Sequence, residues 1–331
     1  MTDEEKHKKF DVIIGNPPYQ EEKMNTGRQA KPLYNLFVEQ AKEMNPAMIS
    51  MITPSRWFAG GIGLNKFRDE MMNDNHIEKI VDYPNAKEVF SNTSISGGVN
   101  YFVWNKNYSG ECQFDSISQH KKSTMKRSLG EFPVLVRYNE AAKIINKIRK
   151  YHQNTMDSIV SPISPYGLST KVRGVSHKDM QHDLTLFSSQ GRSYISRDEI
   201  TKGTNSIDTF RVMIGQTSAE HAGEPSSDGK FKVLTNAVRI LNPGEICTHS
   251  YIFIGPFPEN ESANVLLYLK TKFVRFLLLQ ALTSIHISKS TFVFVPFQDF
   301  TQVWNDEKLN QKYNLNDDEI KYINHFIKEM D

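Results

Sequence analysis

The sequence predicts an α/β protein, in which a doubly wound sheet is followed by a second domain of mixed α+β character with helices near its C-terminal end. Two observations carry this prediction. Between residues 10 and 82, apolar strand-like runs alternate with amphipathic helix-like runs, which is the pattern of strands joined by crossover helices. Beyond residue 130 the chain is richer in Gly, Ser, Thr and Pro. The 331 residues suffice for two ordinary domains, expected at 1–130 and 131–331.

The first two elements follow from their apolar patterns. Residues 10–15 (FDVIIG) form a continuous apolar run, which predicts a parallel strand covered on both faces. Residues 32–44 predict a helix with Pro32 in its first position and a stop at Asn45-Pro46. Its predicted buried stripe has helical spacing and consists of Leu33, Leu36, Phe37, Ala41 and Met44.

The alternation then continues along the first domain. We expect a strand at 48–53, a helix near 64–74 and a strand near 77–82. Residues 99–105 and 112–117 are β-like and flank a turn, so they predict an antiparallel hairpin that closes the sheet.

The second region differs from the first in composition and in its pattern of apolar residues. Residues 120–127 (HKKSTMKR) are polar and basic, which indicates a boundary loop that either contacts phosphate or is simply solvated. A helix is expected near 139–151, short β-like pieces between 161 and 262, and helices near 262–282 and 317–329.

Composition excludes several classes of protein. A net charge of +2 and 38% hydrophobic residues are typical of a soluble globular chain. The most apolar stretch, 273–282, is short and contains Arg275, so no membrane span is expected. Cys112 and Cys247 stand far apart without a partner motif, which favours reduced thiols, no metal site and a cytoplasmic protein.

The motif Asn16-Pro17-Pro18-Tyr19 directly follows the first predicted strand. Ligands of open α/β sheets bind at the carboxyl ends of the strands. The two prolines stiffen the loop and donate no N–H, Asn16 adds an amide oxygen acceptor, and Tyr19 adds a flat aromatic face. A stiff structural turn is the alternative interpretation.

This set of groups suits the activation of an exocyclic amine on a nucleobase. The Asn16 side chain and the Pro17 carbonyl can accept both N–H hydrogens, which favours a tetrahedral nitrogen with a localised lone pair. That nitrogen can attack an electrophilic methyl group without a strong base. Tyr19 would stack on a base flipped out of the duplex.

FDVIIGNPPY resembles the catalytic motif of amino-group methyltransferases. More of the chain is similar to one branch, the adenine-N6 DNA methyltransferases of restriction–modification systems, of type II or IIG. The similar stretches lie at 32–41, 51–71, 80–90, 94–104, 164–174, 269–278 and 295–315.

The resemblance implies a partial Rossmann-like methyltransferase sheet in 1–130 and a target-recognition domain in 131–331 that binds double-stranded DNA in a prokaryotic cytoplasm. It implies S-adenosyl-L-methionine as cofactor, with Asn16, Pro17, Pro18 and Tyr19 as catalytic residues. It also implies that Phe90 stacks on the flipped adenine opposite Tyr19, against the alternative of an ordinary core aromatic.

The family's glycine-rich cofactor loop, which precedes the catalytic motif in this branch, finds no match in residues 1–15. Gly60, Gly61 and Gly63, followed by Asp82 at the end of the next strand, imitate a dinucleotide fingerprint. Lys66 stands where a third glycine belongs, so we set this stretch aside and leave the cofactor residues unassigned. We expect a missing N-terminal region or a second polypeptide to carry the cofactor motif, and the isolated chain to be inactive and to expose an apolar sheet edge.

Two other functions stay open. One is a non-catalytic DNA-recognition or specificity protein, a remnant of such an enzyme. The other is a protein glutamine methyltransferase, against which the long region beyond residue 130 argues. No nuclease motif is evident in the sequence.

Overall fold

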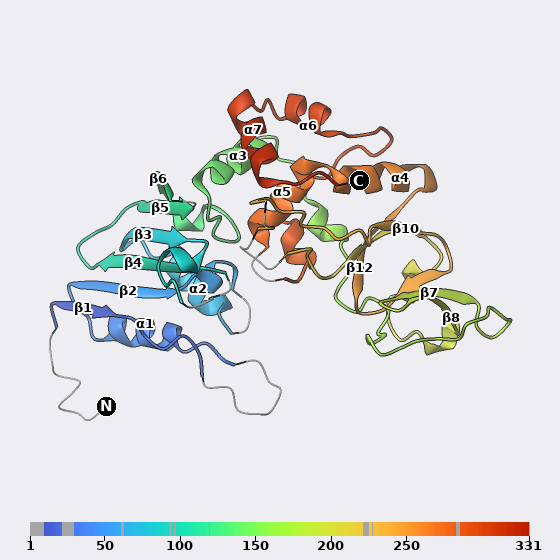
Figure 1. Cartoon of the computed structure of the whole chain (residues 1–331), viewed down its shortest axis with the longest axis horizontal. Coiled ribbons are helices and arrows are strands. Elements are labelled where there is room, and N and C mark those ends of the chain that lie inside the picture. The colour runs from blue at the N-terminus through green and yellow to red at the C-terminus, as the bar shows by residue number, and fades with distance from the viewer. Residues whose placement is uncertain are drawn as a thin grey trace. The chain divides into compact units, whose positions relative to one another are not determined.

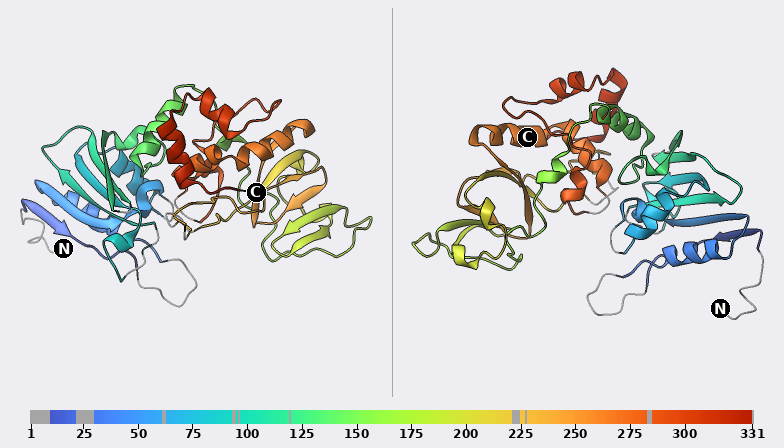
Figure 2. Two further views of the ribbon diagram at one scale, coloured as in Figure 1. Left: turned by 45° about the horizontal axis from the view of Figure 1, so that its top comes forward. Right: turned by 180° about the vertical axis from the view of Figure 1, so that it is seen from behind.

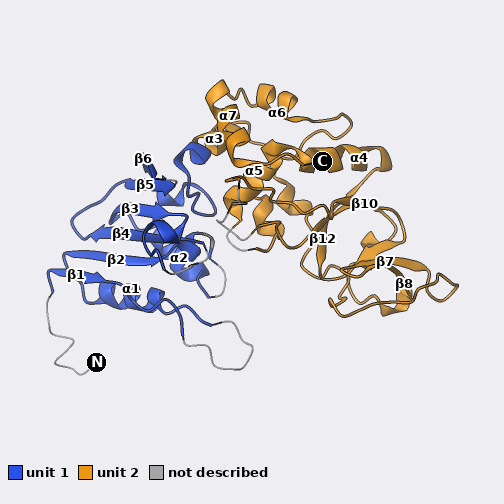
Figure 3. Cartoon of the chain, viewed as in Figure 1, with its two compact units in different colours: residues 1–142 blue, residues 143–331 orange. Residues whose placement is uncertain are grey.

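A computed structural model describes residues 10–21, 30–60, 63–92, 95, 97–118, 120–220, 225–226, 228–282 and 285–330. The chain forms two compact units, Met1–Ala142 and Lys143–Asp331 (Figure 3). The division falls within a helix, α3 (Asn139–Arg149), a little beyond the expected boundary at residue 130. Each unit is described separately below.

Unit 1 is built on one mixed sheet with the strand order β1-β2-β4-β3-β5-β6 (Figure 1). Its six strands are β1 (Val12–Gly15), β2 (Met48–Pro54), β3 (Ile77–Tyr83), β4 (Val99–Asn105), β5 (Cys112–Ser118) and β6 (Lys121–Arg127). The strands β1, β2, β3 and β5 run in one direction, and β4 and β6 run in the other. The carboxyl ends of β1, β2 and β3 therefore share one edge of the sheet.

Two predictions for this sheet are wrong. β4 and β5 do not pair as a hairpin, because β3 lies between them and pairs antiparallel with β4 and parallel with β5. The basic stretch expected to be a boundary loop is the strand β6, which pairs with β5 along its whole length. Lys121, Lys122 and Lys126 are exposed on this strand, which is how natural proteins protect a sheet edge from pairing.

Helices cover one face of the sheet (Figures 1 and 2). They are α1 (Tyr34–Glu43), the 3₁₀ turn η2 (Ser55–Ala59) and α2 (Asn65–Met72). The core lies between the helices and the strands. The helical layer contributes Tyr34, Val38, Trp57, Phe58, Phe67 and Met71, and the strands contribute Ile49, Met51, Ile80, Phe102, Trp104 and Phe114. The expected α/β architecture is confirmed for this unit.

The opposite face of the sheet is open at its β1 end. Val12 and Ile14 are 50% and 79% exposed, and Met48, the register partner of Val12, is also exposed. β1 has one strand neighbour, β2, so it is an edge strand instead of the covered strand that its apolar run predicted. The expected exposed apolar sheet edge is thereby confirmed for the described residues.

The helix α1 differs from its prediction in two respects. Pro32 precedes the helix and forms an antiparallel bridge with Gln20, so the helix begins after Leu33. The buried stripe is Tyr34, Asn35, Val38 and Ala41, whereas the predicted members Leu36 and Phe37 are exposed. These two apolar side chains are exposed on the helix side of the sheet, whereas Val12 and Ile14 are exposed on the opposite face.

Unit 2 contains two three-stranded sheets, with the orders β10-β9-β12 and β11-β7-β8. Their strands are β7 (Leu184–Ser188), β8 (Gly191–Ile195), β9 (Phe210–Gly215), β10 (Arg239–Leu241), β11 (Glu245–Cys247) and β12 (Tyr251–Phe257). The two sheets enclose a shared core that includes Leu186, Met213, Ile246 and Phe253.

Within the described residues, unit 2 also holds the C-terminal part of α3 and the helices α4 (Glu259–Lys270), α5 (Lys272–Ala281), α6 (Asp306–Lys312) and α7 (Asp317–Phe326). The single helix predicted for 262–282 is two helices, since Thr271 ends α4 and its side chain accepts a hydrogen bond from the Val274 N–H to cap α5. Within the described residues, no helix is both long and apolar enough to cross a membrane.

Candidate active site

The Asn16–Tyr19 loop leaves the carboxyl end of β1 and is fixed at both ends. Upstream, Gly15 pairs with Met51 in the parallel β1–β2 ladder. Downstream, the Tyr19 carbonyl accepts a hydrogen bond from the Leu33 N–H at 3.2 Å, directly before α1. The prolines add their own restriction on φ, so little freedom remains between these anchors.

The side chains of this loop divide into buried and accessible ones. Pro17 is buried, while Asn16 and Pro18 are exposed. An exposed Asn16 leaves its amide oxygen available to accept a hydrogen bond from a ligand. The motif therefore presents a polar acceptor on a loop held by a buried proline.

Tyr19 is half-buried, and its hydroxyl is buried without a hydrogen-bond partner among the described residues. Burial raises the pKa of this phenol, so the side chain stays neutral at physiological pH. A neutral ring of this kind is suited to stacking and carries no charge toward a base.

Phe90 lies at the same sheet edge as Tyr19. It follows β3 and the 3₁₀ turn η3 (Ala86–Glu88), and its N–H donates to the Ala86 carbonyl at 2.8 Å. The ring is half-buried. It belongs neither to the core between the helices and strands of unit 1 nor to the core shared by the two sheets of unit 2. Stacking of a base between Phe90 and Tyr19 remains a prediction.

The Asp82 carboxylate is buried and already paired, so it is closed to a cofactor ribose. Arg137 donates two hydrogen bonds of 2.9 Å to its carboxylate, and the Ser55 hydroxyl donates a third at 2.6 Å. The carboxylate is fully buried.

The two described glycines upstream of Asp82 differ. A Cβ at Gly60 would lie 2.3 Å from the Asn65 side-chain oxygen, so side chains already fill that space, whereas a Cβ at Gly63 would meet nothing within 4 Å. Gly61 and Ile62 lie outside the described residues. At Gly60 and Asp82 the residues present do not fit S-adenosylmethionine.

Sequence reasoning missed the polar groups around Asp82. Ser55 follows β2, Asn100 lies on β4, and Arg137 lies beyond the sheet, 55 residues from Asp82. No local pattern connects these positions. The one available signal was an acidic residue at the end of an otherwise apolar strand, because a buried carboxylate requires a partner.

Arg275, the charged residue in the most apolar stretch, is a structural residue of unit 2. It is buried and donates hydrogen bonds to the carbonyls of Lys270, Lys232 and Lys328. Burial lowers the pKa of its guanidinium. This geometry leaves no role in phosphate contact.

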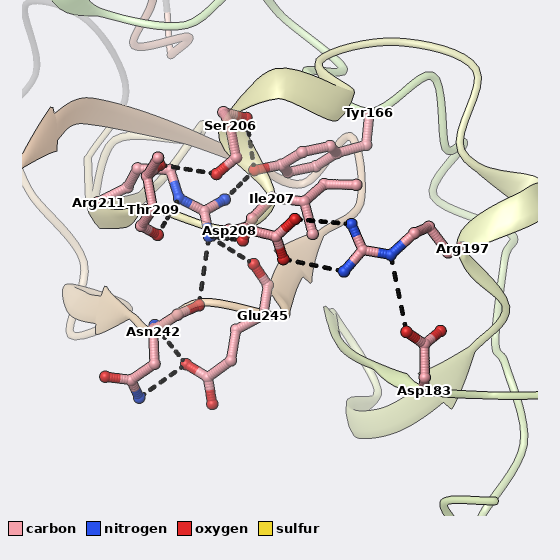
Figure 4. A network of polar contacts seen from close by, with 10 residues as sticks. All are labelled: Tyr166, Asp183, Arg197, Ser206, Ile207, Asp208, Thr209, Arg211, Asn242 and Glu245. Carbon is pink, nitrogen blue, oxygen red and sulfur yellow. Dashed lines mark hydrogen bonds and ion pairs between the residues drawn. The ribbon is translucent and has the colours of Figure 1, made fainter. Parts of the chain in front are cut away.

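A second buried arginine, Arg211 on β9, joins the two sheets of unit 2 (Figure 4). It donates to the carbonyls of Ile207, Asn242 and Glu245, and also to the Tyr166 hydroxyl. Since Glu245 belongs to β11 and Arg211 to β9, this side chain fixes one sheet against the other.

Both cysteines are free and buried, and burial raises the pKa of each thiol to about 12. Among the residues with described positions, no group of three or more His, Cys, Asp or Glu side chains is arranged to hold a metal ion.

Comparison with known proteins gives one family and one curated relative. Residues 1–90 match the family described as Eco57I restriction-modification methylase. Over 121 residues the chain is 38% identical to an uncharacterized adenine-specific methylase of Mycoplasma pneumoniae; the match covers 35% of this chain and 28% of that protein. The chain therefore spans just over a quarter of the length of this curated relative.

Two solved structures are also similar. The type IIG restriction endonuclease BpuSI aligns with 12% identity and a TM-score of 0.36, over 95% of this chain and 49% of its own. The type IIL restriction-modification enzyme MmeI, solved in complex with DNA, aligns with 10% identity and a TM-score of 0.43, over 86% and 46%. The segment that carries the Asn16–Tyr19 motif, residues 1–90, matches the Eco57I restriction-modification methylase family, in line with the resemblance seen in the sequence.

Proposed function

We propose that this chain contributes the catalytic loop and the target-recognition region of a DNA adenine-N6 methyltransferase of a restriction–modification system. The observation that carries the proposal is the Asn16–Tyr19 loop, which presents an exposed amide and a neutral half-buried aromatic ring at the carboxyl edge of the sheet. The family match of residues 1–90 supports it.

The role of the chain's own residues is to bind and orient the amine. The Asn16 amide oxygen and the Pro17 carbonyl accept the two hydrogens of the exocyclic nitrogen, which directs its lone pair out of the base plane. These acceptors bind more strongly as the nitrogen becomes positively charged, so they stabilise the transition state. Tyr19 and Phe90 hold the extruded base by stacking.

S-adenosyl-L-methionine would supply the electrophilic methyl group. Because Asp82 and Gly60 do not fit this cofactor, we assign its binding to a further segment or a second polypeptide. Exposed apolar side chains on both sides of β1 support this assignment: Val12, Ile14 and Met48 on the open face of the sheet, and Leu36 and Phe37 on α1. A parallel strand added to β1, with its own helices, would cover the surface and complete the sheet.

Double-stranded DNA is the proposed substrate, and unit 2 is the proposed recognition domain. Sequence-specific enzymes need a surface that reads base edges, and a separate folded unit of 189 residues, 331 minus 142, provides room for one. A protein glutamine methyltransferase requires no such unit.

Replacement of Asn16 tests the proposed chemistry. In the complex of this chain with the cofactor-bearing segment, Asn16→Ala should lower methyl transfer to DNA by roughly 10²–10³-fold, the usual cost of one preorganised group. Asn75→Ala, at an exposed asparagine before β3 at the other edge of the sheet, is the matched control and should retain parental turnover. Near-parental turnover of Asn16→Ala would refute the assigned role.

A further inference from the structure

The catalytic edge of the sheet contains a buried ion pair that the proposed chemistry does not use. Asp82, at the end of β3, receives both hydrogen bonds of the Arg137 fork at 2.9 Å. Such bidentate pairs have a defined geometry and hold both partners in one orientation. The Asp82 carboxylate is completely buried, so this orientation does not relax into solvent.

Ser55 connects this ion pair to the neighbouring strands. Its hydroxyl donates to Asp82 at 2.6 Å, and its N–H donates to the Gly98 carbonyl at 3.0 Å. Asn100 on β4 donates its side-chain amide to the Thr53 carbonyl on β2 at 3.3 Å. Through Ser55, the Asp82 carboxylate at the end of β3 is therefore connected to the end of β2 and to the beginning of β4.

The end of β2 is also the support of the catalytic loop. β2 is the one strand that pairs with β1, and their register ends with Gly15 opposite Met51. Thr53 follows Met51 by two residues, as Pro17 follows Gly15, so the parallel register directs the end of β2 along the loop. We therefore expect the position of the loop to depend on the end of β2.

Two polar atoms next to this ion pair have no partner. The Thr53 hydroxyl and the Asn100 amide oxygen are fully buried and have no hydrogen-bond partner among the described residues. Buried polar groups left in this state are uncommon in native proteins. A buried ion pair is itself weak evidence for stability, because desolvation offsets the attraction of the charges.

We propose that Asp82 is a positioning residue for the catalytic loop: with Arg137 it holds Ser55, and through Ser55 the end of β2 on which Asn16–Tyr19 rests. The inference rests on the methyl transfer proposed above. Asp82 itself touches no substrate in this account.

The chain offers a matched control at the opposite edge of the same sheet. Asp74, before β3, accepts hydrogen bonds from Lys42 at 2.6 Å, from the Trp104 indole at 2.9 Å and from the His76 N–H at 3.0 Å. It is a part-buried acidic side chain, 15% exposed, with a cationic partner, and it lies at the amino end of β3. Asp74→Asn therefore removes an acidic anchor at the opposite end of the same strand.

Hydrogen exchange of the peptide that spans residues 10–21 is the first readout, because it requires no activity. Asp82→Asn should accelerate exchange at Asn16, Tyr19 and Gln20, and Asp74→Asn should leave it at the parental rate. Ser55→Ala keeps the ion pair and removes the link to β2, so it should reproduce the effect of Asp82→Asn even if that variant folds poorly.

Methylation kinetics in the complete complex are the second readout. Asp82→Asn and Ser55→Ala should lower kcat by on the order of 10–10²-fold, the effect of misplacing a reacting group, with KM for DNA little changed. Equal loop exchange in the two aspartate variants, or an unchanged loop and kcat in Ser55→Ala, would overturn the inference. If the parental complex does not methylate DNA, the proposed function fails, while the exchange comparison still decides the positioning role.

Discussion

Ile14→Lys tests the proposal that the open surface at β1 is a protein interface. Ile14 is 79% exposed on an edge strand, so the fold loses little apolar burial when it is replaced. Substitutions at such positions usually change the free energy of unfolding by less than about 0.5 kcal/mol. The variant should therefore fold with nearly parental stability.

The effect on association should be larger. Complete burial of an isoleucine is worth about 1.5–3 kcal/mol, so covering the exposed 79% of Ile14 in an interface contributes roughly 1–2 kcal/mol. Each 1.4 kcal/mol is a factor of ten in Kd, and burial of the new ammonium group adds to the loss. Ile14→Lys should weaken association by at least about tenfold.

Sedimentation velocity of the isolated chain over a range of concentrations is the assay. Without the cofactor-bearing segment, the exposed β1 edge should pair with a second copy, and Ile14→Lys should shift this association to higher concentration. Val303→Lys, at a 45% exposed position of unit 2, is the control and should leave it unchanged. A parental chain that stays monomeric throughout, or equal association of parental chain and Ile14→Lys, would refute the reasoning.

Three further predictions follow from individual side chains. Phe90→Ala should abolish most of the fluorescence rise of 2-aminopurine placed at the target position, because stacking contributes roughly 1–3 kcal/mol per base; an undiminished rise would remove Phe90 from the site. Cys112 and Cys247 should resist alkylation in the native chain at neutral pH and react on unfolding, since burial raises the pKa of both thiols to about 12. Because the pKa of each thiol in the folded state exceeds its ordinary pKa of 9.0, the thiols stabilise the fold fully below pH 9.0 and lose that contribution as the pH rises toward about 12. A Cys112→Ala/Cys247→Ala variant should therefore lose less Tm at alkaline pH than the parental chain. An equal loss of Tm in the two proteins would contradict the assignment. Arg275→Met should lower the free energy of unfolding by about 1–3 kcal/mol, measured by denaturant titration, because the carbonyls it serves lose their donors; a change below about 0.5 kcal/mol would show that those carbonyls are satisfied otherwise.

The strands and helices of the first domain could be predicted because each has a local pattern. The apolar runs of β1, β2 and β3 and the helical spacing of α1 are visible in short windows of sequence. Where the prediction failed, partners distant in sequence decided the structure. β3 inserts between β4 and β5, and no pattern within residues 99–117 carries that information.

Edge strands and exposed faces were predicted less well than buried ones. β6 was missed because its exposed lysines give it the appearance of a loop, although every residue from Lys121 to Arg127 pairs with β5. Leu36 and Phe37 were predicted to be buried because an apolar residue on a helix normally faces a core. In this chain those side chains lie on an open surface, and a single sequence does not distinguish a core from an interface.

The candidate site also has a part that a local sequence pattern predicts and a part that depends on distant residues. The Asn16–Tyr19 loop could be recognised because all of its chemistry lies in four consecutive residues after a strand. The support beneath it could not, because Ser55, Asp82 and Arg137 come from three distant segments and meet only in the folded sheet.

The most direct test of the central claim is the identity of the methylated product. The complex of this chain with the cofactor-bearing segment is incubated with double-stranded DNA and labelled S-adenosylmethionine, and both the digested nucleosides and the protein fraction are analysed by mass spectrometry. We expect labelled N6-methyl-2′-deoxyadenosine from the DNA, absent when Asn16 is replaced by alanine. Label on a protein glutamine or on another base, or DNA binding without any methyl transfer, would contradict it.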